Sequence, residues 1–158
     1  MNYELAENEI ATKLLSNLDI STYCDVIPLP DDVSEYRIPT IKGLITVVFI
    51  SEKFESNQSV GQVSQHSTAT FSISIQARRL RGVKGVYAIS EMVKKSLVGF
   101  RPSDCGALVL GDHDFAGYQN DVWEHTLSFA CRTLRTQDEA YYVPGTAVTD
   151  DNVFYQKK

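Results

Sequence analysis

The side chains best suited to chemistry in this 158-residue chain form the consecutive triplet Asp112, His113 and Asp114. A metal ion could bind the imidazole and one carboxylate, as in a small hydrolase. No second histidine lies two or four residues away, so the spacing of the common zinc sites is absent. The triplet stands between Gly111 and Gly117, and aspartate favours turns. We therefore interpret this segment as a turn and keep the hydrolase as an alternative.

The other histidines and the cysteines give no stronger signal of a catalytic site. His125 falls on the apolar face of a predicted strand, which favours a buried, hydrogen-bonded side chain over a ligand. Three cysteines are an odd and sparse set, so we expect reduced thiols at Cys24, Cys105 and Cys131. The sequence contains no G-x-S-x-G motif, no P-loop and no G-x-G-x-x-G motif. We expect no catalytic residue, no cofactor and no bound metal.

The charge balance bears on the class of partner. Fifteen basic and twenty acidic residues give a net charge of −5, which argues against general affinity for DNA or RNA. Arg78, Arg79 and Arg81 are the one basic cluster, either a solvated corner or a surface for an anionic partner. Trp123, the single tryptophan, is either a core anchor or an interface residue. As a hypothesis, all four side chains contact a partner.

Hydrophobic periodicity predicts the elements that position these residues. Apolar side chains three and four residues apart predict helices over 3–18 and 82–98. Alternating or continuous apolar runs predict strands over 41–50, 68–78, 107–110 and 122–134. Between them we expect a proline-rich connector over 19–39, with a short extended piece at 24–29, and a long polar loop over 51–66. No apolar run approaches the ~20 residues of a membrane helix.

Two predicted strands have faces that suggest contacts with other molecules. The strand over 41–50 is apolar on both faces, so its own domain or another subunit must cover it. The strand over 68–78 has one polar face of hydroxyls and an amide that would meet water or a polar channel. The candidate subunit-interface residues on the first strand are Leu44, Val47 and Phe49. The polar residues on the second strand are Thr70, Ser72, Ser74 and Gln76.

The order of elements predicts one α+β domain over 1–135, with a small antiparallel or mixed sheet covered by two helices. Residues 136–158 lack periodicity but are rich in aromatic side chains, which is unusual for an unstructured tail. We expect them to form an extended C-terminal arm that packs on a neighbouring subunit through Tyr141, Tyr142 and Phe154.

This layout resembles the phage tail terminator proteins, in particular the Gp37-like family of Mu-like contractile-tailed phages. The most specific part is a helix that ends in Leu97, the following Gly99-Phe100-Arg101-Pro102, a short strand, a turn and a strand led by Trp123. The resemblance covers residues 5–134. It is also carried by the opening helix with Ile10, Leu14 and Leu18, the strands over 44–50, 69–77 and 123–129, and the stretch Gly85-Val86-Tyr87.

The resemblance implies a structural virion protein without catalytic activity. It implies a hexameric ring on the head-proximal end of the tail tube that stops polymerisation and joins the tail to the neck. The expected partners are other copies of the chain, the tube, sheath and neck proteins, and DNA only in transit, with no membrane. The polar strand would then line the lumen, because a surface with few phosphate contacts does not retain DNA, and the loop over 51–66 would reach the tube or the neck. The expected location is the tail or neck of the virion, after assembly in the host cytoplasm.

Three alternatives stay open. The chain could be another neck protein, such as a head–tail adaptor, which composition does not distinguish from a terminator. It could be a small hydrolase that uses Asp112, His113 and Asp114. It could also be an adaptor domain of a cellular pathway, which would remain monomeric or dimeric.

Overall fold

The structure is a computed structural model that describes residues 1–32 and 42–138. Its five strands form one mixed sheet in the order β1-β2-β3-β5-β4, in which β1 pairs with β2 in parallel and the other pairs are antiparallel. The predicted α+β class is confirmed. The elements in chain order are α1 (Tyr3–Leu15), α2 (Leu18–Tyr23), β1 (Cys24–Pro28), β2 (Gly43–Phe54), β3 (Ser64–Ala77), α3 (Val86–Leu97), β4 (Val109–Gln119) and β5 (Val122–Thr136).

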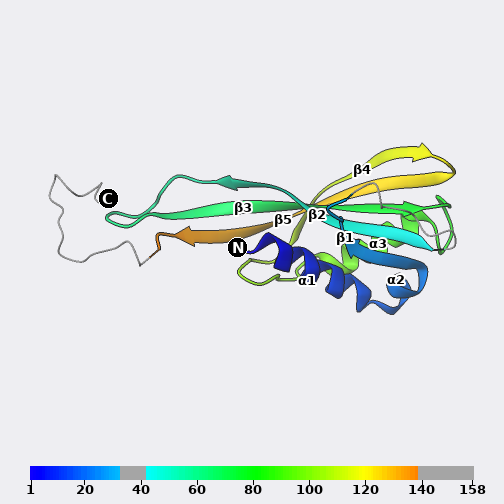
Figure 1. The fold of residues 1–158 in the computed structure, drawn as a ribbon, viewed down its shortest axis with the longest axis horizontal. Helices are drawn as coiled ribbons and strands as arrows, with labels where there is room; N and C mark the ends of the chain where they lie inside the picture. Colours follow the sequence, from blue (N-terminus) through cyan, green and yellow to red (C-terminus); the bar gives the residue numbers. More distant parts are fainter. Residues whose placement is uncertain (33–41, 139–158) are drawn as a thin grey trace.

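The helices lie on one side of the sheet, and part of the sheet extends beyond them (Figure 1). This hairpin extension consists of residues 52–68 of the β2–β3 hairpin together with residues 132–136 of β5. Among the described residues, none of the helices has the length and hydrophobicity to span a bilayer.

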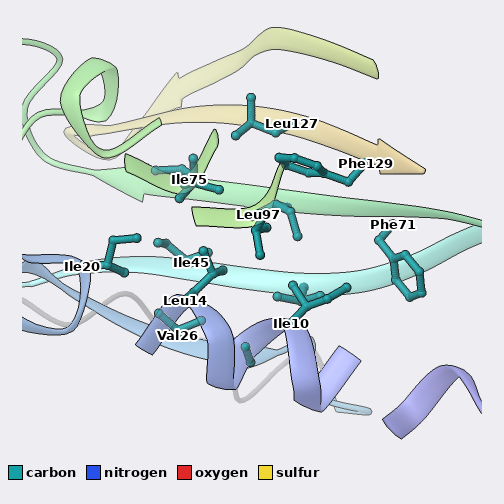
Figure 2. Close-up of a cluster of buried hydrophobic side chains, with 14 of the residues drawn as sticks. Ile10, Leu14, Ile20, Val26, Ile45, Phe71, Ile75, Leu97, Leu127 and Phe129 are labelled. Carbon is teal, nitrogen blue, oxygen red and sulfur yellow. The ribbon is translucent and has the colours of Figure 1, made fainter. Parts of the chain in front are cut away.

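The core lies between the sheet and the helices, as the strand alternation predicts (Figure 2). Every second residue of β3 from Ala69 to Ala77 is buried, and Phe71 is fully buried. Leu127 and Phe129 of β5 continue the same face. The helices contribute their apolar stripes, among them Ile10, Leu14, Ile89, Val93 and Leu97.

The first predicted helix is shorter in the structure, and a second helix follows it. Helix α1 ends at Leu15, and the side chain of Asn17 accepts hydrogen bonds from the backbone N–H groups of Asp19 and Ile20. Asparagine is a strong N-cap, so it starts the new helix α2 inside the predicted connector. The extended piece expected at 24–29 is confirmed as β1. Gly99, just after the end of α3, has a φ of 89°, the left-handed conformation that commonly ends a helix at a glycine.

Two predicted loops are strands in part or throughout. Residues 51–54 and 64–66 of the polar segment continue the ladder, with Lys53 opposite Thr68, and the loop between β2 and β3 is limited to residues 55–63. The segment predicted as a turn at 111–117 lies inside β4, where two register shifts absorb its irregular residues. The turn itself is Asn120-Asp121, whose φ values of 53° and 61° fit a two-residue hairpin. Backbone pairing with a long neighbouring strand outweighs weak local strand preference.

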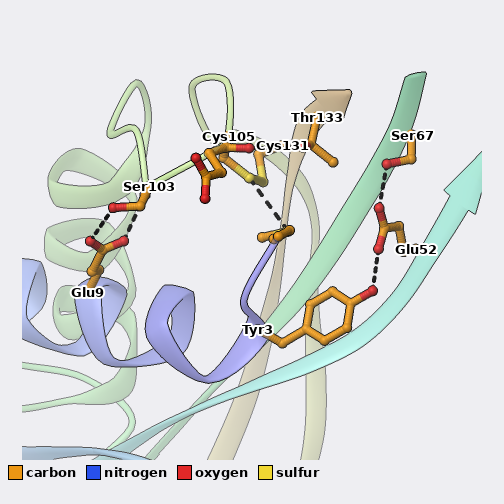
Figure 3. The surroundings of a disulfide bond; sticks show 10 residues. Tyr3, Glu9, Glu52, Ser67, Ser103, Cys105, Cys131 and Thr133 are labelled. Carbon is orange, nitrogen blue, oxygen red and sulfur yellow. Dashed lines mark hydrogen bonds between the residues drawn. A yellow bond between two sulfur atoms is a disulfide. The ribbon is translucent and has the colours of Figure 1, made fainter. Parts of the chain in front are cut away.

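A polar cluster joins the start of α1 to the hairpin extension (Figure 3). The carboxylate of Glu52 accepts hydrogen bonds from the hydroxyls of Tyr3 and Ser67. Burial alone would raise the pKa of Glu52, but these hydrogen bonds, together with the positive charges of Arg135 and the N-terminus, outweigh it and the pKa lies below its ordinary value. The Tyr3 ring also stacks on Phe49 with 3.9 Å between ring centroids. Together these contacts fix the direction of the extension relative to the body.

The expectation of three reduced thiols is wrong for two of the cysteines. The structure joins Cys105 and Cys131 as a disulfide with 6.0 Å between their Cα atoms (Figure 3). These residues are 26 positions apart in the sequence. They meet because β5, which contains Cys131, runs beside the segment that follows α3, which contains Cys105. Cys24 is a free, buried thiol, and burial raises its pKa to about 12.

Candidate interaction surfaces

The four residues predicted to line a channel lie together on the sheet face opposite the core. Thr70, Ser72, Ser74 and Gln76 alternate with the buried residues of β3 and remain half-buried. Their cross-strand neighbours on β5 are also small or polar: Ala130, Ser128, Thr126 and Glu124. The hydroxyl of Ser74 donates a 2.6 Å hydrogen bond to the carboxylate of Glu124, the one charged group among these eight side chains. This surface, the hydroxyl face, therefore offers hydrogen-bonding groups with little charge.

The structure covers most of the predicted interface strand with its own chain. Val47 is fully buried in the core, and Leu44 is 2% exposed. Phe49 is half-buried between Tyr3 and Phe71. Both apolar faces of this strand are therefore largely covered within one domain. Three further candidate interface residues, Tyr141, Tyr142 and Phe154, lie outside the described residues.

The predicted partner-contact residues gather near the α3 end of the sheet. Arg78 donates to the backbone carbonyl of Asn120 at 3.4 Å, and the Arg81 guanidinium lies 5.7 Å from the centre of the Tyr87 ring. Arg79 is exposed beside them. Trp123 is half-buried, with its ring 4.4 Å from that of Tyr118. These side chains come to one region because β4 pairs with β5 and because α3 begins next to β5.

The sequence did not reveal the aromatic cluster that surrounds Trp123. Phe115 and Tyr118 of β4 and Tyr87 of α3 have exposed rings. Phe115 contacts both Trp123 and His125, and Tyr87 also contacts His125. The signal available in the sequence was the two-residue spacing of His113 and Phe115, which indicates a strand where we predict a turn.

The side chains of Asp112, His113 and Asp114 do not converge on one point, because successive residues of a strand point to opposite faces of the sheet. The backbone N–H of Asp112 donates to the hydroxyl of Ser128 at 2.7 Å. His113 Nε2 instead lies 2.8 Å from Nδ1 of His125, so one imidazole donates to the other. His125 is 7% exposed, which confirms the expected buried, hydrogen-bonded histidine. Within residues 1–32 and 42–138, no three metal-ligating side chains gather at one point.

The histidine pair should make stability depend on pH. Burial lowers the pKa of both His113 and His125, and for His113 the charges of Lys94 and His125 lower it further, against smaller opposing effects of Glu91 and Asp114. The unfolded chain, with histidine pKa values near 6.5, therefore binds more protons than the folded chain. The free energy of unfolding should fall as the pH drops through this value.

We expect the thermal midpoint to decrease between about pH 7.5 and about pH 5.5, with a smaller decrease in His113→Gln. Differential scanning calorimetry of both proteins over this range tests the prediction. An identical slope for the two proteins would show that the pair does not titrate as described.

Comparison with known proteins identifies the family of this chain. A chain from the virion of a native gene transfer agent particle is similar in structure, with a TM-score of 0.49 and 15% sequence identity, over 80% of this chain and 92% of that one. No curated protein matches the sequence. The family model described as Gp37 protein matches residues 20–147, which is most of the chain. This protein therefore belongs to the Gp37 protein family.

Proposed function

We propose that this protein is a structural component of a phage virion, where it forms a ring on the head-proximal end of the tail tube. The ring stops polymerisation of tube and sheath and joins the tail to the neck. Membership in the Gp37 family supports the virion role. The observation that supports the ring is the polar, nearly uncharged composition of the hydroxyl face, defined by the half-buried residues Thr70, Ser72, Ser74 and Gln76 with their β5 neighbours.

The hydroxyl face suits the wall of a channel that DNA must cross. Proteins bind DNA mainly by neutralising phosphates with lysine and arginine, and each such contact adds affinity. The eight central side chains of this face contain one carboxylate and no cation. The hydroxyl groups of a channel lined by this surface would bind water. Such a channel would bind the phosphate backbone of DNA only weakly.

The remaining surfaces are assigned to the neighbouring proteins. The hairpin extension exposes Val60 fully and Phe54 by half, which suits a contact with the tube or the neck. The arginines and Trp123 near α3 contact a partner, and Tyr141, Tyr142 and Phe154 belong to an arm that packs on the next subunit. Of the predicted interface residues on β2, Phe49 is the most accessible, whereas Val47 supports the interface only through the core.

The first test is a phage that lacks this protein. A terminator predicts tails of uncontrolled length, which electron microscopy of the lysate measures directly. Tails of normal length that fail to join heads would overturn the capping role and indicate a head–tail adaptor.

The lumen assignment has a separate test in Ser72→Arg. A ring of about six copies would place that many extra cations in the channel, and we expect the infectious titre to fall at least about tenfold because retained DNA leaves slowly. Ser72→Gln is the matched control, since it adds bulk without charge. Unchanged titre and normal tails for Ser72→Arg would show that this face lies elsewhere.

A further inference from the structure

The disulfide between Cys105 and Cys131 lies at the base of the hairpin extension (Figure 3). Cys131 of β5 is opposite Ala69 of β3, and Ala69 is opposite Glu52 of β2. The disulfide therefore shares a row of the sheet with the polar cluster that joins the extension to α1. The pairing of β4 with β5 reaches only to Ala130, so at this row the segment that follows α3 lies beside β5 in place of β4.

The apolar core ends at the same row of the sheet. Phe71 and Phe129 form the last cross-strand pair of large buried apolar side chains before the extension. On the far side of the row, the buried pair on the same face is Ser67 and Thr133, which carry hydroxyl groups. Little apolar packing therefore fixes the base of the extension, and its rigidity depends on hydrogen bonds and on the disulfide.

Residues 104–106 connect the base of the extension to the rest of the domain. The hydroxyl of Thr133 donates a hydrogen bond to the carbonyl of Asp104 at 2.8 Å, and the Gly106 N–H donates to the carbonyl of Arg132 at 2.7 Å. Asp104 has a φ of 61°, a conformation that residues other than glycine adopt less readily. The disulfide holds this short segment, at Cys105, against β5.

The two sulfur atoms differ in their access to reagents in solution. Cys105 is half-buried, whereas Cys131 is 2% exposed, so a small disulfide reaches Cys105 first. The Cys105 thiolate attacks this small disulfide, which forms a mixed disulfide and releases one small thiol. The Cys131 thiolate then attacks the Cys105 sulfur and releases the second small thiol. In total, the two cysteines transfer two electrons and two protons to the small disulfide and form one bond between their sulfur atoms.

We propose that Cys105 and Cys131 form a redox switch that sets how rigidly the hairpin extension is attached to the body. The dithiol form leaves the base of the extension to its hydrogen bonds, and the disulfide form fixes its direction. The cytosol keeps thiols reduced and an extracellular medium favours disulfides, so the chain assembles as the dithiol and oxidises after particle release. This timing rests on the proposed virion function, whereas the redox response of the chain itself does not.

Hydrogen exchange followed by mass spectrometry measures the rigidity of the extension in the purified full chain. The chain is compared after oxidation with oxidised glutathione and after reduction with dithiothreitol. We expect backbone amides of residues 64–68 and 132–136 to exchange at least about threefold faster after reduction, because local opening becomes easier. Amides of residues 71–75, in the body of the sheet, should change less. The thermal midpoint of the reduced chain should be lower by about 5–10 °C, because the cross-link no longer restricts the unfolded chain.

Two cysteine variants assign the redox response to the pair. Cys105→Ala removes the disulfide at a half-buried position outside the strands, and its extension should exchange equally fast in both buffers. Cys24→Ala is the matched control, since it removes the sulfur of the free, buried cysteine and should keep the full redox response. Equal exchange of the unmutated extension in the two buffers would overturn the proposal, as would an undiminished response in Cys105→Ala.

The timing of oxidation is tested by alkylation with N-ethylmaleimide under denaturing conditions. In chains from infected cells that are quenched before lysis, we expect all three cysteines to be alkylated. In chains from released particles, only Cys24 should be alkylated. A disulfide already present inside the cells, or free thiols at both positions in released particles, would show that the pair does not switch on release. Absence of the chain from particles would refute the proposed function, whereas the exchange experiment judges the redox response independently.

Discussion

Phe71→Ala should lower the free energy of unfolding by about 3–5 kcal/mol. The Phe71 side chain is fully buried on the core face of β3, and its ring meets Phe49 edge-on with 5.9 Å between centroids. Its cross-strand partner is Phe129, which is also fully buried. Truncation would remove apolar burial and leave a cavity that the flanking strands are too rigid to close. For a domain of this size the loss is a large part of the total stability.

Urea denaturation of the two proteins, followed by tryptophan fluorescence, measures the difference. Ser72→Ala is the matched control, because Ser72 is the next residue on the same strand and lies on the hydroxyl face. We expect the control to change stability by less than about 0.5 kcal/mol. Similar losses for both variants would mean that the two faces of β3 are not buried as described.

Glu52→Ala should cost about 1–3 kcal/mol, because it leaves polar groups without their acceptor. The hydroxyl of Ser67 is fully buried and donates to Glu52, and the Tyr3 hydroxyl donates to the other carboxylate oxygen. The pKa of Glu52 is lowered in the folded chain, so its contribution is present above the ordinary carboxyl pKa and is lost as the pH falls. The cost of Glu52→Ala should therefore shrink in acid.

Glu55→Ala is the matched control for this cluster. Glu55 forms a 3.0 Å ion pair with Arg132 on the same hairpin extension, but both side chains are about half exposed. Exposed ion pairs contribute less than about 1 kcal/mol, so this variant should be nearly neutral. Urea denaturation of both variants at neutral and acidic pH measures the two changes in the free energy of unfolding. A larger loss for Glu55→Ala than for Glu52→Ala would contradict the stabilising role of Glu52.

Sequence patterns succeeded where one local rule dominated. The strict alternation from Ala69 to Ala77 placed both faces of β3 correctly, because a one-residue error would bury the hydroxyls and expose Phe71 and its neighbours. The apolar stripe located α3 in the same way, although the helix begins at Val86 and not at residue 82 as predicted.

The patterns failed where pairing with a distant strand decided the conformation. Residues 111–114 look like a turn, yet β5 holds them in β4, and the hydrogen bond of Asp112 to Ser128 belongs to that pairing. The approach of His113 to His125 and the closure of Cys105 on Cys131 are likewise consequences of the path of β5.

The sequence by itself determined the α+β class, the buried and polar faces of β3, and the resemblance that led to the Gp37 family. Side-chain periodicity and family pattern carry this information locally, because each residue's face depends on its near neighbours. The tertiary structure alone decided that Val47 is internal and that β4 is an exposed edge of the sheet. Those properties depend on strand order, which no single segment encodes.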